Sequence, residues 1–558
     1  MLSSFATAST SSSSSPYETS SSRWKFNFTT NSFAALSAIF FASYVPSPQE
    51  SSIINVAEKR KTSSVYNYRL YTNGNSHHDG NADDEPLRIL LFSESFPSFT
   101  SGVVRRFKEI VRRLVKRRHH IHIITGCNNA VSWTEGNELL EKYVTFTILP
   151  STEFTNKIDC ACPFLFPNVS ATPILYSVIR RISPDVIHII EQTPAALLCG
   201  AFAKALEIPI VWSSHTNIDF YLSTYIRPFA VTMTRRIYQF IRLQHLCFSS
   251  INLTVSKDFA DFMEQTGIPK PVIVWKTGVD SDLFNPSRYS SEMRYRMFGT
   301  YNNYTKEQMD TITLFLCVGR ISPEKNFEFL SLVLERIPSQ TFLCIIGDGP
   351  YRQTLEPRFP KDRVHFFGFL GGDELASAYA SADYFIYASV SETFGQVYLE
   401  AMACGTPVIA AEGGQLKEFF VNGEHGYLWE PDDLDSAEEA VREAMKDRKY
   451  LSTKARTQAL KHSWEAASDQ INSIYHDAIR NHKEQESNKK TSKLKHIWHL
   501  AYYFFIWLIC NLCALFFMAP FIRVSPPQSV TTKKINKLNG NSVEEQHNSL
   551  MTKKSSVS

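Results

Sequence analysis

Short hydrophobic runs alternate with longer amphipathic stretches along most of the chain from Leu87 onwards. The runs have the length of strands and are rich in Val, Ile, Leu and Phe, which is typical of strands buried on both faces. Strands that alternate with helices predict parallel sheets covered by helices on both sides. The predicted strands are 88–93, 121–126, 186–190, 208–215, 251–256, 314–320, 341–349, 363–368, 384–389 and 407–411, and the clearest predicted helices are 103–116, 195–205 and 464–482.

The alternation is interrupted near 279–301 and then starts afresh. Two doubly wound domains of about 200 and about 150 residues fit this pattern. We therefore expect an α/β protein with two Rossmann-like domains that face a cleft. Residues 87–285 would form the N-terminal domain, and residues 286–482 the C-terminal domain.

Residues 1–86 do not have the pattern of a domain. Ser and Thr dominate residues 3–22, an apolar stretch follows at 33–45, and a polar linker lies at 73–84. The apolar stretch is too short to cross a bilayer, but it has the length of a signal-peptide core or of part of a targeting leader. We expect a targeting leader followed by a disordered linker. A disordered polar tail with one apolar patch is the alternative.

Residues 497–522 form a longer hydrophobic stretch that contains no Asp, Glu, Lys or Arg. A helix of this length can cross a hydrocarbon core of about 30 Å. Most of its Trp and Tyr residues lie near its N-terminal end, where interfacial anchors occur. We expect a C-terminal transmembrane helix and a single-pass membrane protein, with a buried core helix as the alternative. The polar residues 523–558 are expected to be a disordered tail.

Charge and cysteine content narrow the classes of partner. The formal net charge is +3 over 558 residues, which is too small to indicate nucleic acid as a partner. The 10 cysteines have neither the spacing of a zinc site nor that of a disulfide framework. We therefore expect reduced, buried thiols.

Candidate binding residues follow the ends of predicted strands, where ligands of open parallel sheets bind. Gly102 opens the first helix and would let backbone N–H groups approach an anion, although a single glycine is a weak signal. Gly319 and Arg320 end a predicted strand, and Lys325 begins the next helix. Two cations separated by a loop could hold a diphosphate. Two solvent-exposed charges are the alternative.

The strongest signal is the stretch 391–407, which follows a predicted strand and opens a helix. Glu392 in the loop can reach sugar hydroxyls, and Glu400 further along the helix can accept hydrogen bonds from a ribose diol. Phe394 and Gly395 lie between them, and Gly395 keeps the helix N-terminus open for a phosphate. Paired carboxylates also serve glycoside hydrolysis, but a hydrolase does not need the glycine-rich anion site around them. A helix start with two solvated acids is the alternative.

Taken together, these motifs resemble the retaining GT-B enzymes of glycosyltransferase family 4. The resemblance covers roughly 88–480 and includes the two cations, the acidic pair, Gly-Asp-Gly-Pro at 347–350 and Gly-Gly at 413–414. One branch looks closer still, namely the plant and cyanobacterial sulfoquinovosyltransferases and the related glycolipid mannosyltransferases. That closer match rests on residues 101–102, 106–107, 184–188, 215–216, 275, 278–281, 284–286 and 292–294, although 215–219 read more like the mannosyltransferases.

The resemblance implies a retaining hexosyltransferase that moves a sugar from a UDP-sugar, UDP-sulfoquinovose in the first branch, to a lipid such as diacylglycerol. A mannosyl- or other hexosyltransferase acting on a glycolipid is the alternative. Arg320 and Lys325 would meet the charge of the leaving diphosphate, and Glu392 would hold the donor sugar. His215 would face the anomeric centre from the acceptor side, unless it is a packed residue. Arg106 is a candidate for an acidic group on the donor, unless it is a surface charge.

The resemblance also implies that no metal and no cofactor is needed. Asp-x-Asp sequences occur at 280–282 and 433–435, but neither is placed like a metal loop. A lipid acceptor suits a membrane-attached chain, and basic residues within 112–118 could contact anionic headgroups or simply be solvated. We expect a plastid envelope or thylakoid location rather than the endoplasmic reticulum. A nucleotide-sugar-binding protein without turnover and a phosphorylase-like or epimerase-like enzyme are the rival classes.

Overall fold

A computed structural model of the chain describes residues 85–487 with short gaps. The gaps are 97–101, 128–129, 150–170, 216–234, 236–238, 240–248, 269–270, 300–303, 391, 393–394 and 415. Within this part the chain forms two fully parallel sheets, and the expected alternation of strands and helices is confirmed.

The first sheet has seven strands in the order β3-β2-β1-β4-β5-β6-β7. In this order the direction of winding reverses between β1 and β4, which makes that point the topological switch of the sheet. Three-residue β7 and the alternating β3 were not predicted. The strands are β1 (Arg88–Phe92), β2 (His120–Thr125), β3 (Val144–Ile148), β4 (Val186–Ile189), β5 (Ile210–Ser214), β6 (Ile251–Thr254) and β7 (Val272–Val274).

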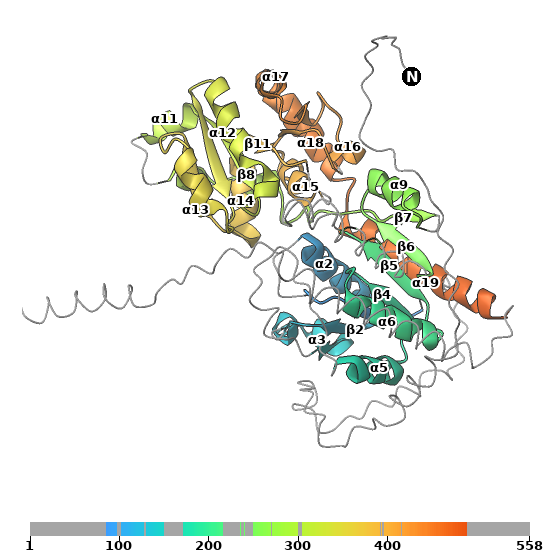
Figure 1. Cartoon of the computed structure of the whole chain (residues 1–558). Helices are drawn as coiled ribbons and strands as arrows, with labels where there is room; N and C mark the ends of the chain where they lie inside the picture. The colour runs from blue at the N-terminus through green and yellow to red at the C-terminus, as the bar shows by residue number, and fades with distance from the viewer. Residues whose placement is uncertain are drawn as a thin grey trace, which may run out of the picture. The chain divides into compact units, whose positions relative to one another are not determined.

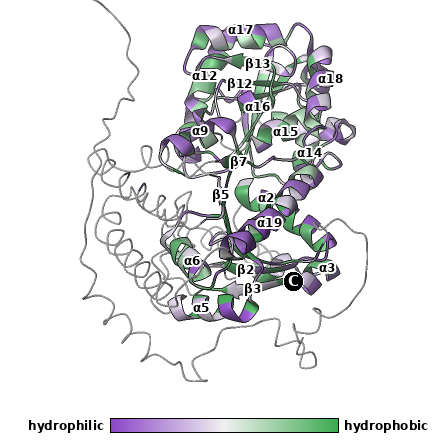
Figure 2. Ribbon diagram, turned by 90° about the vertical axis from the view of Figure 1, so that its right-hand side faces the viewer, coloured by the Kyte–Doolittle hydropathy of each residue, from purple (hydrophilic) through white to green (hydrophobic). Residues whose placement is uncertain are grey.

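Successive residues of these strands pack on opposite faces of the sheet, as the period of a strand requires. In β1, Ile89 and Leu91 belong to the hydrophobic core under α2 (Gly102–Lys116), whereas Leu90 and Phe92 belong to the core under α5 (Ala171–Ile182) and α6 (Pro194–Ala205). Helices α5 and α6 lie together on their face (Figure 1). Further helices of this region are η3 (Ala130–Trp133), α3 (Glu138–Tyr143) and α9 (Lys257–Gln265), the last with a hydrophilic side in Figure 2.

The second sheet repeats the same winding with six strands in the order β10-β9-β8-β11-β12-β13, so its switch point lies between β8 and β11. Strand β13 was not predicted. The strands are β8 (Thr313–Val318), β9 (Thr341–Ile346), β10 (Val364–Gly368), β11 (Tyr384–Tyr387), β12 (Val408–Ala411) and β13 (Gly426–Trp429). Its helices are η4 (Pro286–Arg288), α10 (Ser291–Phe298), α11 (Lys306–Thr311), η5 (Pro323–Lys325), α12 (Phe327–Arg336), α13 (Arg352–Leu355), η6 (Glu356–Arg358), α14 (Gly372–Ser381), α15 (Gln396–Ala403), α16 (Leu416–Phe419), α17 (Leu434–Ala444) and α18 (Arg448–Ala459).

Helix α19 (Trp464–Ser487) follows the second sheet in sequence but packs with the first. Its residues Trp464, Ile471 and Tyr475 belong to the same hydrophobic core as α2. The indole Nε1 of Trp275 donates to the carbonyl oxygen of Ala467 over 2.9 Å. The predicted second domain, which ran to residue 482, therefore includes a helix that the structure packs against the first sheet.

Among the described residues, no helix is long and apolar enough to cross a membrane. The transmembrane helix expected at 497–522 and the tail expected at 523–558 lie outside the described residues. So do the leader and linker expected at 1–86, apart from residues 85 and 86. Cysteines in the described part are buried and free, namely Cys127, Cys199, Cys317, Cys344 and Cys404.

Candidate active site

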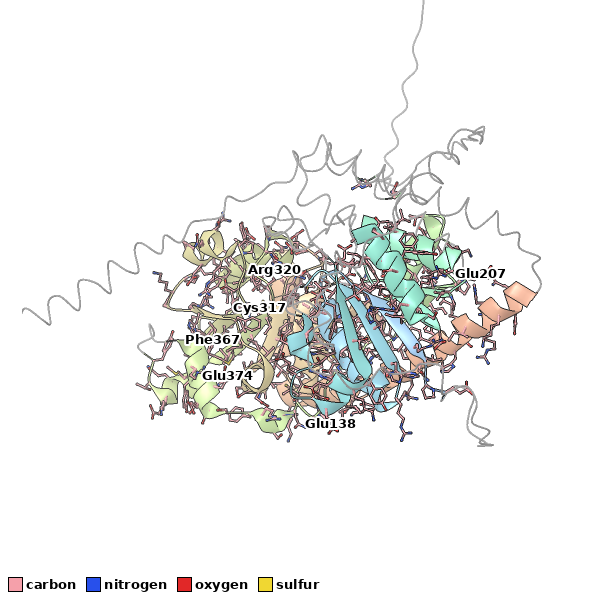
Figure 3. All side chains as sticks on the ribbon, turned by 90° about the horizontal axis from the view of Figure 1, so that it is seen from below. Glu138, Glu207, Cys317, Arg320, Phe367 and Glu374 are labelled. Carbon is pink, nitrogen blue, oxygen red and sulfur yellow. The ribbon has the colours of Figure 1, made fainter. Side chains whose placement is uncertain are left out.

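The switch point of the second sheet brings together two of the loops singled out in the sequence. Strands β8 and β11 are neighbours, so the loops that follow them leave the sheet side by side. Gly319 and Arg320 follow β8, and Arg320 is exposed just beyond the strand that carries the buried Cys317 (Figure 3). Lys325 ends η5 and donates to the Glu392 carboxylate after β11, with 2.8 Å between Nζ and Oε2.

Both side chains of this ion pair are largely sheltered, with 12% of Lys325 and 17% of Glu392 exposed. A pair at this depth interacts more strongly than one in open water, because solvent screens it less. It places one cation and one carboxylate at the point where the fold presents ligands. The arrangement suits a phosphate on the lysine side and hydroxyl groups on the carboxylate side.

The glycine motifs of this region allow backbone segments to approach closely. Gly347 has a φ of 138°, and a Cβ at this position would overlap the carbonyl oxygen of Gly319. Gly414 has a φ of 56°, and a Cβ there would overlap the carbonyl oxygen of Glu392. Only glycine combines these backbone angles with such close contacts. The two motifs therefore hold the loops that carry Arg320 and Glu392 in place.

Helix α15 begins after Gly395, which is its N-cap residue, and carries Glu400 on its buried side. The Glu400 carboxylate lies 2.5 Å from Nη1 of Arg105 on α2, and 2% of the glutamate side chain is exposed. Burial raises the pKa of Glu400, while the Arg105 charge and hydrogen bonds from Tyr379 and Gln396 act in the opposite direction. Phe394 lies outside the described residues.

Arg105 was not predicted, whereas its neighbour Arg106 was named as a candidate donor contact. Arg106 is fully buried, and its guanidinium carbon lies 3.6 Å from the centre of the Trp275 ring. Its Nη2 donates to the carbonyl oxygens of Trp275 at 3.0 Å and Lys276 at 2.6 Å. It is therefore not a surface charge, and it ties α2 to the segment that follows β7. Gly102, also predicted, is the exposed first residue of α2.

His215 follows β5 directly and is buried, with 4% of the residue exposed. Its Nε2 lies 2.8 Å from the hydroxyl of Ser213, and its ring meets Phe107 edge-on. Burial, followed by the charge of Arg106, lowers the pKa of His215 well below its usual range. The ring is therefore neutral at physiological pH.

The switch point of the first sheet is built around Glu191, which follows β4 and was not predicted. Its Oε1 accepts from the hydroxyls of Ser93 at 2.6 Å and Ser95 at 2.8 Å, and its Oε2 accepts from the backbone N–H of Glu94 at 3.0 Å. Burial raises the pKa of Glu191, and these hydrogen bonds oppose the rise. The position of Glu191 directly after the predicted strand 186–190 was the sequence signal by which it could have been found.

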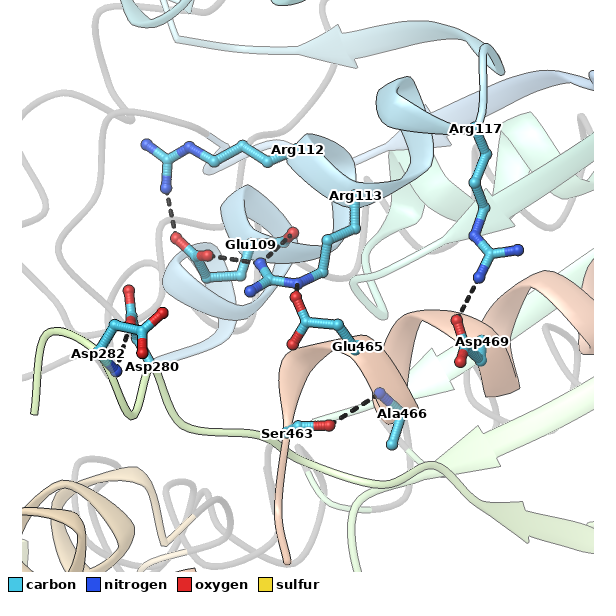
Figure 4. Close-up of polar contacts among 10 residues, drawn as sticks. All are labelled: Glu109, Arg112, Arg113, Arg117, Asp280, Asp282, Ser463, Glu465, Ala466 and Asp469. Carbon is cyan, nitrogen blue, oxygen red and sulfur yellow. Dashed lines mark hydrogen bonds and ion pairs between the residues drawn. The ribbon is translucent and has the colours of Figure 1, made fainter. Parts of the chain in front are cut away.

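The basic residues of α2 that were considered for lipid headgroups are largely engaged in ion pairs (Figure 4). Arg112 and Arg113 pair with Glu109 on the same helix. Arg113 also reaches Glu465 of α19 at 2.8 Å, and Arg117 pairs with Asp469 of α19. These contacts hold α2 and α19 together, which is a structural role.

The two Asp-x-Asp sequences have local backbone roles. Asp280 accepts from the backbone N–H groups of Asp282 and Leu283, and Asp433 caps the N-terminus of α17. Among the described residues, no group of three or more His, Cys, Asp or Glu side chains is placed to hold a metal ion.

Two doubly wound parallel domains, with paired acids and cations at the switch point of the second, define the GT-B class of glycosyltransferase. The chain matches the Glycosyltransferase Family 4 model over residues 100–283 and the Glycosyl transferases group 1 model over residues 305–462. It is 32% identical over 408 residues to a sulfoquinovosyl transferase of Arabidopsis thaliana, covering 71% of this chain and 74% of that protein. The chain belongs to glycosyltransferase family 4 and is a glycosyltransferase.

Other relatives and solved structures agree on this class. A GDP-mannose-dependent alpha-mannosyltransferase of Corynebacterium glutamicum is 28% identical over 71% of this chain and 90% of its own length. The sucrose-phosphate synthase of Thermosynechococcus elongatus matches with a TM-score of 0.56 at 20% identity, over 71% of this chain and all of that one. The Anabaena HepE structure in complex with UDP matches with a TM-score of 0.53 at 19% identity, over 70% of this chain and all of that one. At these identities the structures support the fold alone.

Proposed function

We propose that the enzyme transfers sulfoquinovose from UDP-sulfoquinovose to diacylglycerol, with retention of the anomeric configuration. The observation that carries the choice of sugar is the 32% identity with the Arabidopsis sulfoquinovosyl transferase, which extends over both sheets. The ion pair between Lys325 and Glu392 supports a diphosphate sugar as the donor, because it supplies a cation and a hydroxyl acceptor side by side.

In this proposal, Arg320 and Lys325 face the diphosphate, with the N-terminus of α15 at Gly395 adding N–H groups. Glu392 holds hydroxyls of the sugar, and Glu400 accepts from the ribose diol. A ribose at Glu400 would compete with Arg105 for the same carboxylate, so Arg105 has to share or release it. No metal and no cofactor takes part, and positively charged side chains meet the leaving-group charge instead.

A lipid acceptor is supported by the names of two relatives, both of them alpha-monoglucosyldiacylglycerol synthases. An alpha-monoglucosyldiacylglycerol synthase of Streptococcus pneumoniae is 26% identical over 62% of this chain and 75% of its own length. The apolar stretch at 497–522 would hold the enzyme at the bilayer that contains the acceptor. We propose a single-pass protein of the plastid envelope or thylakoid, because the proposed sulfolipid product points to that organelle. Retention of the full-length chain, but not of a chain ending at Lys495, in membranes washed with carbonate tests the attachment.

The second candidate function is transfer of mannose or another hexose to a glycolipid. It is favoured by the GDP-mannose-dependent mannosyltransferases among the relatives.

One experiment separates the two functions. The full-length enzyme is incubated with a lipid mixture that supplies both diacylglycerol and glycolipids and, separately, with UDP-sulfoquinovose, GDP-mannose or UDP-glucose. The lipid products are identified by mass spectrometry. We expect sulfoquinovosyldiacylglycerol with an α-linkage by NMR. If a lipid product formed with GDP-mannose or UDP-glucose but not with UDP-sulfoquinovose, the proposed donor would be wrong. A β-linkage in the product would exclude retention of the anomeric configuration.

A further inference from the structure

A continuous line of buried polar groups leads from α19 to His215 inside the first domain. The hydroxyl of Tyr475 lies 2.7 Å from Nδ1 of His188, and Nε2 of His188 lies 2.8 Å from the hydroxyl of Ser213. The same Ser213 hydroxyl lies 2.8 Å from Nε2 of His215. Tyr475, His188 and Ser213 each have a relative exposure of 0%.

Strand periodicity explains why these groups meet. Val186 of β4 and Val211 of β5 face the core under α2 and α19. His188 and Ser213 stand two residues further along the same strands, so they face the same helices. Tyr475 belongs to α19, which packs on this face of the sheet, and its hydroxyl reaches His188. The rings of Phe107 and Trp275 pack against both histidines and close the sides.

Both histidines are neutral in this setting. Burial, followed by the nearby Arg106 charge, lowers the pKa of His188 to about 3 and that of His215 well below its usual range. A neutral imidazole has one N–H donor and one acceptor nitrogen. Each histidine ring therefore donates a hydrogen bond from one nitrogen and accepts one at the other, which gives the line of hydrogen bonds a single direction.

The direction is decided at Tyr475. Burial raises the pKa of this phenol, so it keeps its proton. Among the described residues, Nδ1 of His188 is the acceptor within hydrogen-bond distance of that hydroxyl. If His188 Nδ1 instead carried the proton and donated to Tyr475, the phenol O–H would lose Nδ1 as its hydrogen-bond acceptor. Leaving a buried donor unsatisfied costs about 1–3 kcal/mol. Tyr475 therefore donates to His188, His188 donates to Ser213, and Ser213 donates to Nε2 of His215.

We propose that Tyr475, His188 and Ser213 are positioning residues that fix His215 in the Nδ1–H tautomer, so that this ring offers its ligand a hydrogen-bond donor and not a base. The proposal rests on the proposed function and on the placement of His215 at the anomeric centre, which the family resemblance implies. A donor at this place suits an oxygen of the sugar or of the acceptor. It excludes deprotonation of the acceptor hydroxyl by Nε2, because Ser213 occupies that nitrogen.

Paired substitutions at His215 test the tautomer. Asn places its amide N–H₂ near the position of Nδ1, and Gln places its amide near that of Nε2. We expect kcat/KM of His215→Asn to exceed that of His215→Gln by about tenfold, the equivalent of one hydrogen bond. The opposite order would overturn the proposal.

The relay itself is tested with Tyr475→Phe and Ser213→Ala in the full-length enzyme, and with Ser213→Thr, which restores the hydroxyl. The matched control is Thr147→Val. Thr147 is buried in the same sheet, and its hydroxyl lies 2.9 Å from Nε2 of another buried histidine, His122, whose pKa burial lowers to about 3. His122 is not one of the groups that form the line to His215. We expect Tyr475→Phe and Ser213→Ala to lower kcat by about tenfold with little change in KM, and Ser213→Thr to recover most of it.

Nitrogen-15 NMR of histidine-labelled protein, with the His215 signals assigned from His215→Asn, reads the tautomer without any substrate. We expect a protonated Nδ1 in the wild type and a mixture of tautomers in Ser213→Ala. A wild-type ring protonated at Nε2, or kinetics of the relay variants equal to those of Thr147→Val, would contradict the proposal. Because the NMR result needs no turnover, the wrong donor sugar would leave it unaffected.

Discussion

The two sheets wind in the same order, yet their switch points carry opposite chemistry. In each, a glutamate follows the fourth strand of the winding and is held by the loop that follows the first. Glu191 of the first sheet is held by neutral donors, namely hydroxyl and backbone N–H groups. Glu392 of the second is held by the cation of Lys325.

Under the proposed function, this difference indicates which half would receive the anionic donor. Hydroxyl and amide groups fix a loop without adding positive charge, whereas a lysine and a nearby exposed arginine create an attractive site for a diphosphate. The fold supplies the position of a ligand site in both halves, and the residues placed there supply its chemistry.

The largest expected effect comes from removing the cation of the second switch point. Lys325→Ala should lower kcat about a hundredfold or more, because one charge-stabilising donor in the transition state is lost. Steady-state kinetics with a thermal unfolding curve measures this effect apart from misfolding. Lys446→Ala, which removes an exposed cation paired with Glu443, is the control. Near-normal turnover of Lys325→Ala would mean that the two switch points do not differ as described.

The corresponding change in the first switch point should affect stability more than turnover. Glu191→Gln replaces one carboxylate oxygen with an N–H₂ group, which faces the backbone N–H of Glu94 or the serine hydroxyls. We expect a loss of about 1–3 kcal/mol in the free energy of unfolding. Denaturant titration measures it. A fall in kcat as large as that of Lys325→Ala would instead place Glu191 in the reaction.

A smaller effect is expected in the pH profile when Arg105 is changed. Burial raises the pKa of Glu400, and Arg105 opposes that rise, so Arg105→Gln should raise the pKa further. The ionised carboxylate that accepts from ribose is lost as the pH falls through this pKa. The acid limb of kcat/KM for the donor should therefore move to higher pH. Arg112→Gln, on the same helix, should leave the limb in place, and an unchanged limb in Arg105→Gln would remove Glu400 from ribose binding.

The smallest expected effect is that of chelation. Side-chain cations at the second switch point replace a metal in the proposed reaction, so activity should persist in excess EDTA. Initial rates before and after dialysis against EDTA measure this. Complete loss of activity that Mn²⁺ or Mg²⁺ restores would show that a metal does the work assigned to Arg320 and Lys325.

The fold and the residues of the second switch point could be predicted from the sequence, whereas Glu191 of the first switch point was not predicted. Continuous apolar runs identified ten strands, and parallel strands present their ends at one edge of a sheet, so the sequence placed Lys325 and Glu392 at the same edge. That the two side chains meet depends on the pairing of β8 with β11. Strand β7 was missed because three residues carry no periodicity. Strand β3 reads VTFTI and β13 reads GYLW, so neither is the continuous run of Val, Ile, Leu and Phe by which the other strands were identified.

Contacts between distant segments could not be predicted. Arg106 has the sequence context of an exposed helix residue, and its burial depends on Trp275, which lies 169 positions away. The bond between His188 and Tyr475 joins residues 287 positions apart. No local periodicity encodes such a pairing, because it depends on how α19 returns to the first sheet.

The return of α19 has a consequence for biosynthesis. A growing chain emerges from the ribosome at about 5–20 residues per second, and domains generally fold from the N-terminus onwards. The first sheet lacks Tyr475, Glu465 and Asp469 until nearly all of the second domain has been translated. Its last strand, β7, ends at Val274, about 200 residues before the middle of α19, which is a delay of roughly 10–40 s at that speed. The half that begins first is therefore completed last, and during that interval the face of α2 that packs against α19 lacks its partner helix.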